Sequence, residues 1–154
     1  MIYTPMINKA LRIMFTAHRD QCDKNGVPYV FHPFHVAEQM KDEDTVTAAL
    51  LHDTVEDAGL TPGYLREQGF NVRVVNAVAV LSHDDCEDYF DYVRRVRQDP
   101  IARAVKLADL EHNSDLSRIE EPAAEDFRRA EKYRKAIAIL KGEEDLRYAD
   151  LDLR

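Results

Sequence analysis

The segment that most constrains the fold of this chain is residues 48–57, which read Ala-Ala-Leu-Leu-His-Asp-Thr-Val-Glu-Asp. Its first half is suited to burial, and an ionisable group placed directly after a buried run is costly unless an opposite charge compensates it. On a continuous helix, Glu56 would stand one turn beyond His52, and Asp57 one turn beyond Asp53. The spacing therefore predicts a central helix with a cation-binding group of side chains, for which a divalent metal ion is the simplest candidate.

The composition of the chain favours one helical domain spanning residues 1–154. Hydrophobic residues make up 45% of the sequence and charged residues 32%, as in globular proteins. The net charge of −8 argues against a nucleic-acid-binding surface. No apolar run reaches the roughly 18 residues of a membrane span, the N-terminus lacks a signal-peptide pattern, and the two cysteines form no motif. We therefore expect a cytoplasmic protein without a membrane or nucleic-acid partner, whose oligomeric state the sequence leaves open.

Apolar residues recur at helical spacing along most of the chain, which predicts an all-α bundle of about eight helices. The expected helices span residues 5–20, 33–40, 42–56, 61–69, 71–81, 87–98, 100–116 and 125–141. Phe15 and Phe127 are expected on the apolar stripes of the first and last of these helices. The motif-bearing core would be residues 5–141, followed by an acidic tail, 142–154, whose apolar residues suit a short docked helix.

Three of the expected helices carry a side chain that can bind a metal ion next to an apolar run. His32 stands at the entrance of the second helix, His52 and Asp53 follow the central apolar run, and Asp109 follows Ala108. Two imidazoles and two carboxylates with open positions suit Mn²⁺, Fe²⁺ or Zn²⁺ in a catalytic site better than a closed structural zinc site. The pattern predicts a metal-assisted hydrolase, although a lone histidine is more often a core or capping residue.

The order and context of these residues resemble those of the HD-domain phosphohydrolases. Four segments carry the resemblance, which covers roughly residues 5–141: Ala17-His18, residues 26–33 (GVPYVFHP), residues 48–57 (AALLHDTVED) and residues 105–113 (VKLADLEHN). They are most similar to the hydrolase domain of RelA/SpoT-type proteins, which cleaves the alarmone (p)ppGpp to GDP or GTP and pyrophosphate. The resemblance implies an HD-domain helical bundle that works as a stand-alone small alarmone hydrolase.

The same resemblance implies roles for ten residues. The metal ligands, usually for Mn²⁺, would be His32, His52, Asp53 and Asp109. The catalytic acidic pair would be Glu56 and Asp57. The residues that contact the nucleotide substrate would be Lys24, Asn113, Arg129 and Tyr133. The last two are placed by spacing alone, and a solvated arginine and a core-edge tyrosine are the alternative.

Two departures from the family pattern concern the nucleotide pocket. Asp23 stands where the family commonly has an arginine that packs on the base, and residues 110–111 and 114–116 differ from the usual residues around Asn113. These departures leave two alternatives open. One is an HD-domain phosphohydrolase for another nucleotide, such as (p)ppApp, a nucleoside monophosphate or a dinucleotide cofactor. The other is a non-catalytic module that binds metal and a nucleotide or protein.

Overall fold

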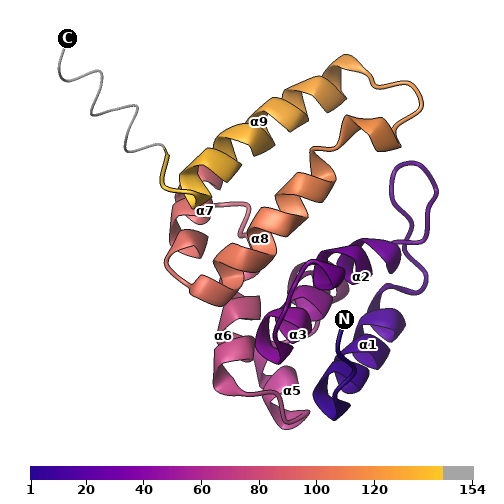
Figure 1. Ribbon diagram of the computed structural model, residues 1–154, viewed down its shortest axis with the longest axis vertical. Helices are drawn as coiled ribbons and strands as arrows, with labels where there is room; N and C mark the ends of the chain where they lie inside the picture. The colour runs from indigo at the N-terminus through magenta and orange to yellow at the C-terminus, as the bar shows by residue number, and fades with distance from the viewer. Residues whose placement is uncertain (144–154) are drawn as a thin grey trace, which may run out of the picture.

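The computed structural model describes residues 1–143, and this part of the chain is an all-helical bundle (Figure 1). It contains nine α-helices and a short 3₁₀ helix. Their bounds are α1 Pro5–His18, α2 Phe31–Glu38, α3 Glu43–Leu51, α4 Thr54–Ala58, α5 Pro62–Glu67, α6 Val72–Leu81, α7 Tyr89–Arg97, α8 Pro100–Asn113, η1 Leu116–Arg118 and α9 Ala124–Leu140. The predicted all-α class is confirmed, whereas the expected docking of the acidic tail concerns residues that lie outside the described range.

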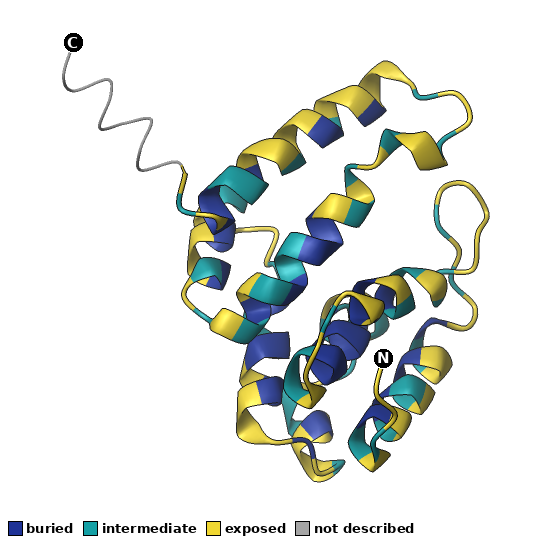
Figure 2. Ribbon diagram, in the orientation of Figure 1, coloured by how far each residue is buried: buried dark blue, intermediate teal, exposed yellow. Residues whose placement is uncertain are grey.

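Helix α3 is the centre of the bundle. Every residue from Val46 to Leu51 is buried, so the helix is covered on all its faces. It packs against α1, α2, α6 and α8, and it is dark blue in the middle of Figure 2. A helix that is apolar on all sides is stable in water only when other elements enclose it. The burial of α3 therefore requires the four helices that pack around it.

Most helix starts follow the local capping signals in the sequence. The side chains of Asp42, Thr61, Asn71 and Asp99 each accept a hydrogen bond from the backbone N–H three residues further on. Proline occupies the first turn of α5 and α8, where its missing N–H is not needed. These caps confirm the predicted starts of α3, α5, α6 and α8.

The prediction of one central helix through Glu56 is wrong, because His52 and Asp53 form a turn between α3 and α4. Two side chains satisfy the last carbonyl groups of α3: His52 Nδ1 donates to the Ala49 carbonyl at 2.6 Å, and Thr54 Oγ1 donates to the Leu51 carbonyl at 2.8 Å. Such side-chain hydrogen bonds compete with the backbone hydrogen bonds that would continue the helix. His52 and Asp53 therefore do not share a continuous helix with the acidic pair.

Two aromatic residues expected in the core are exposed. Phe15 is 58% exposed, because α1 buries the stripe of Ile7, Ala10, Met14 and His18 instead. Phe127 is 56% exposed, and α9 turns the neighbouring residue, Asp126, inward. Both expectations were wrong, since an aromatic residue next to a buried stripe need not lie on it.

The loops that matter for the site meet at one end of the bundle. The connection between α1 and α2 lies at the same end as η1 and the start of α9, and α8 and α9 run side by side (Figure 1). The C-terminal end of α8 and the N-terminal end of α9 therefore face the loop at residues 19–30. None of the described helices is long and apolar enough to cross a lipid bilayer.

Candidate metal centre

Three of the predicted ligands converge inside the bundle from different elements. His32 comes from α2, His52 from the turn after α3, and Asp109 from α8; one ligand atom of each lies within 4.8 Å of the others. Asp109 Oδ1 is 2.9 Å from His32 Nε2 and 3.7 Å from His52 Nε2. His52 and Asp109 are 2% and 4% exposed, so both side chains are almost fully buried, whereas His32 is only partly buried.

The fourth predicted ligand, Asp53, borders the same cluster. Its Oδ2 atom lies 3.0 Å from His52 Nε2 and 3.9 Å from His32 Nε2. The hydroxyl of Tyr29 donates a hydrogen bond of 2.5 Å to this oxygen. Burial, and then the charge of Asp53, raise the pKa of Tyr29, so the hydroxyl keeps its proton and holds the carboxylate in place.

The chemistry of His52 fits a bound cation. Its Nδ1 donates to a carbonyl, whereas its buried Nε2 has no hydrogen-bond partner among the described residues although two carboxylates lie nearby. Burial lowers the pKa of His52, but Asp53 and Asp109 outweigh it and raise the pKa well above its usual value. The carboxylates thus favour a positive charge at Nε2, and a backbone-anchored imidazole is a common metal ligand. The cluster can therefore bind a divalent metal ion.

Two neighbours fix the carboxylate of Asp109. Lys106 Nζ lies 2.8 Å from Oδ2, and Asn113 Nδ2 donates to Oδ1 at 2.8 Å. Burial lowers the pKa of Lys106, but the charge of Asp109 outweighs it and raises the pKa well above its usual value, so the lysine stays charged. The sequence reasoning gave Lys106 no role, although its position three residues before Asp109 places both on one helix face.

A second histidine orients His32. The Nδ1 atoms of His32 and His112 are 2.8 Å apart, and the two rings stack. Burial, and then the charge of Arg118, lower the pKa of His112 to about 4, so its ring is neutral and its Nδ1 can accept a hydrogen bond from the Nδ1–H of His32. That bond leaves His32 Nε2 facing the cluster. The sequence reasoning gave His112 no role either, because the contact joins residues 80 positions apart.

The expected acidic pair lies on the short helix α4, where both residues are exposed. Glu56 Oε1 accepts a hydrogen bond of 3.2 Å from the backbone N–H of His83. Partial desolvation, and then the charges of nearby carboxylates, raise the pKa of both Glu56 and Asp57. Asp53 contributes to both shifts, and its backbone carbonyl accepts a hydrogen bond of 2.9 Å from the N–H of Asp57, so the pair follows the metal cluster by one turn.

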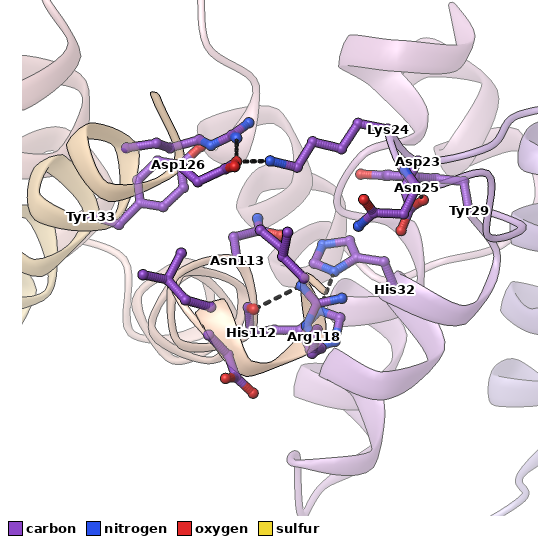
Figure 3. Close-up of a pocket in the computed structure, with 14 residues that line it drawn as sticks. Asp23, Lys24, Asn25, Tyr29, His32, His112, Asn113, Arg118, Asp126 and Tyr133 are labelled. Carbon is purple, nitrogen blue, oxygen red and sulfur yellow. Dashed lines mark hydrogen bonds and ion pairs between the residues drawn. The ribbon is translucent and has the colours of Figure 1, made fainter. Parts of the chain in front are cut away.

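A cavity of about 280 Å³ opens beside His32 and is lined by all four residues expected to contact substrate (Figure 3). They come from three regions: Lys24 from the α1–α2 loop, Asn113 from the end of α8, and Arg129 and Tyr133 from α9. A residue that the sequence reasoning missed, Asp126, joins two of them. This buried carboxylate pairs with Lys24 and, at 2.6 Å, with Arg129.

The contact between Tyr29 and Asp53 gives a first prediction. We expect Tyr29→Phe to weaken Mn²⁺ binding about 10- to 100-fold, because Asp53 loses the hydroxyl that fixes its orientation. Calorimetric titration of metal-free protein measures the change, and Tyr64→Phe on the surface of α5 is the matched control. Equal Mn²⁺ affinities in the two variants would contradict a role of Asp53 at the metal.

Comparison with known proteins gives a consistent family. The profile of the HD domain family matches residues 10–153. The chain is 31% identical over 115 residues to the guanosine-3′,5′-bis(diphosphate) 3′-pyrophosphohydrolase of Aquifex aeolicus, covering 67% of this chain and 16% of that protein. It is 30% identical over 147 residues to the bifunctional (p)ppGpp synthase/hydrolase RelA of Mycobacterium tuberculosis, covering 88% of this chain and 19% of that protein. It thus spans less than a fifth of the length of these relatives.

A solved structure supports the fold. It is described as a metazoan ortholog of SpoT that hydrolyses ppGpp, and it superposes with a TM-score of 0.73 over 92% of this chain and 89% of its own, at 24% identity. The fold and the profile match, which spans nearly the whole chain, agree with the resemblance carried by the sequence motifs. The chain therefore belongs to the HD-domain family.

Proposed function

We propose that this chain hydrolyses the 3′-diphosphate of (p)ppGpp in a reaction that depends on a divalent metal ion, with Mn²⁺ as the native ion. The observation that carries the proposal is the cluster of His32, His52 and Asp109, which borders a cavity lined by basic, amide and phenol side chains. The names of the relatives from Aquifex aeolicus and Mycobacterium tuberculosis support the substrate. A nucleotide partner and a cytoplasmic setting belong to the same proposal.

His32, His52, Asp53 and Asp109 would hold the metal ion, which would supply Lewis acidity and lower the pKa of the attacking water. Glu56 accepts a proton as the water oxygen bonds to the phosphorus next to the ribose. The bond from that phosphorus to O3′ breaks, O3′ takes up a proton from solvent, pyrophosphate leaves, and Glu56 gives its proton back to solvent. Asp57 assists Glu56.

The substrate would lie in the cavity with its phosphates near basic groups. Lys24 and Arg129 bind phosphate oxygens through charge-assisted hydrogen bonds. Asn113 and Tyr133 contact the nucleoside. Because Asp126 already holds Lys24 and Arg129 together, these two cations are positioned before substrate binds.

The direct test uses protein stripped of metal, reloaded with Mn²⁺ and incubated with ppGpp, with Asp53→Ala as the control. We expect GDP and pyrophosphate from the wild type and neither from the variant. Absence of turnover with metal demonstrably bound would contradict the proposed substrate.

A second candidate is an HD-domain phosphohydrolase that acts on another nucleotide. The observation that favours it is Asp23, a carboxylate in the lining of the cavity, where it adds negative charge beside the expected base position. A panel of (p)ppApp, nucleoside monophosphates and dinucleotide cofactors separates the two. A protein that Mn²⁺ stabilises but that turns over no member of the panel would instead be a non-catalytic binding module.

The acidic pair also makes the pH dependence of turnover predictable. The charge of Asp57 helps to raise the pKa of Glu56, and turnover is lost as pH falls through that pKa because the protonated acid accepts no proton. Asp57→Asn removes the negative neighbour, lowers the pKa of Glu56, and is expected to move the acid limb of the kcat profile to lower pH. A limb that moves upward or stays in place would contradict this coupling.

A further inference from the structure

The lining of the cavity has a balanced set of charges. It contains three cations and three carboxylates: Lys24, Arg118, Arg129, Asp23, Asp115 and Asp126. Two of the cations, Lys24 and Arg129, pair with the same oxygen of Asp126. The formal charges of these six side chains sum to zero, so a polyphosphate bound here meets no excess of positive charge. Removal of any one of the three cations would make the lining net negative.

Arg118 differs from the other two cations of the lining, because Lys24 and Arg129 both pair with Asp126 and Arg118 has no carboxylate partner among the described residues. Within the described part of the chain, no carboxylate oxygen lies within 4.0 Å of the Arg118 guanidinium, the limit for an ion pair. Its side chain makes one hydrogen bond, from Nη2 to the His112 carbonyl at 2.8 Å. A guanidinium has five N–H donors in a planar fork that matches a phosphate group. The single bond ties Arg118 to the end of α8 and leaves Nε and Nη1 available to a ligand.

The place of Arg118 sets it apart from the other two cations. Figure 3 shows it beside His112, away from Lys24 and Asp126. It also lines an adjoining cavity of about 380 Å³, which shares His32 and Tyr29 with the first. His32 of the metal cluster, Lys24 and Arg118 all line the first cavity, so a ligand that fills it would meet the cluster and both cations.

We propose that Arg118 binds a second phosphate group of the substrate, one that is not hydrolysed, and so selects nucleotides phosphorylated at two separate positions. The proposal rests on the proposed function and adds the 5′-diphosphate of ppGpp as the group that Arg118 holds. The lining charges support this assignment, because a second phosphate adds negative charge that the Lys24–Asp126–Arg129 group is poorly able to offset. Stacking of the guanidinium on the base is the competing role.

The test measures binding, so that it does not depend on turnover. Dissociation constants for ppGpp and for guanosine 3′-diphosphate, which lacks the 5′-phosphates, are determined by calorimetry in Mn²⁺-loaded Glu56→Gln protein, with and without Arg118→Gln. We expect Arg118→Gln to weaken ppGpp binding about tenfold to a hundredfold, as for other hydrogen bonds to charged groups, and to leave guanosine 3′-diphosphate nearly unchanged. Arg66→Gln on the surface of α5 is the matched control and should affect neither ligand.

Each other outcome overturns the assignment. Equal weakening of both ligands would show that Arg118 contacts the guanosine or the 3′-diphosphate, as base stacking requires. No weakening of either ligand, or no binding of ppGpp to the parent protein, would show that Arg118 holds no second phosphate. If the selective loss is found while wild-type protein turns over no ppGpp, the proposed hydrolysis fails and the phosphate contact stands.

Discussion

Asp109→Ala should both abolish Mn²⁺ binding and lower the free energy of unfolding of the metal-free protein by about 3–5 kcal/mol, the usual cost of breaking a buried ion pair. The metal effect follows because Asp109 Oδ1 faces both histidines of the cluster. The stability effect follows because Lys106, whose side chain is only 15% exposed, loses the carboxylate that balances its charge. Calorimetry measures the first effect and urea denaturation the second.

A double variant separates the two effects. Lys106→Met combined with Asp109→Leu removes both charges, and replacement of a whole buried pair by apolar residues is often neutral or stabilising. We expect this variant to recover most of the stability lost in Asp109→Ala while binding no Mn²⁺. Wild-type Mn²⁺ affinity in Asp109→Ala would contradict the ligand assignment, and unchanged stability there would contradict the buried pairing with Lys106.

The parts of this fold that sequence reasoning predicted are those set by neighbouring residues. Thr61-Pro62 combines a capping side chain with a proline in the first turn, Asn71 and Asp99-Pro100 combine a cap with a following apolar stripe, and each begins a helix in the structure. The apolar run before His52 correctly predicts a buried helix. The break after Leu51 escaped prediction, because His52 and Thr54 can equally well continue a helix or bond to its last carbonyl groups.

The contacts missed within the site are mostly between residues far apart in sequence. Lys24 and Asp126 are separated by 102 positions, so no local pattern links the cation to the carboxylate that holds it. The pairing of His32 with His112 was missed for the same reason, because the two residues are 80 positions apart. Motif resemblance named the residues that the metal and the substrate would contact, but it did not name the partners that orient them.

Glu56→Gln is expected to lower turnover of ppGpp by about 10²–10⁴-fold, the usual contribution of a positioned general base. The amide has nearly the same shape as the carboxylate but accepts no proton at neutral pH. Partial desolvation, and then the charges of Asp57 and Asp53, raise the pKa of Glu56, which strengthens it as a base. Single-turnover kinetics with saturating ppGpp measures the loss without interference from product release.

The same variant should retain the metal site, because Glu56 is not among the side chains that converge on the metal cluster. Mn²⁺ affinity and thermal unfolding are therefore expected to match those of the wild type, and Glu67→Gln on α5 serves as the control for a carboxylate far from the chemistry. Loss of Mn²⁺ affinity in Glu56→Gln would mean that this carboxylate reaches the metal ion itself. Full turnover with Mn²⁺ bound would mean that another group takes the proton, and Asp57 is then the candidate, since it shares α4 and a raised pKa with Glu56. In that case Asp57→Asn alone should abolish turnover, so the pair of variants assigns the base whichever carboxylate it is.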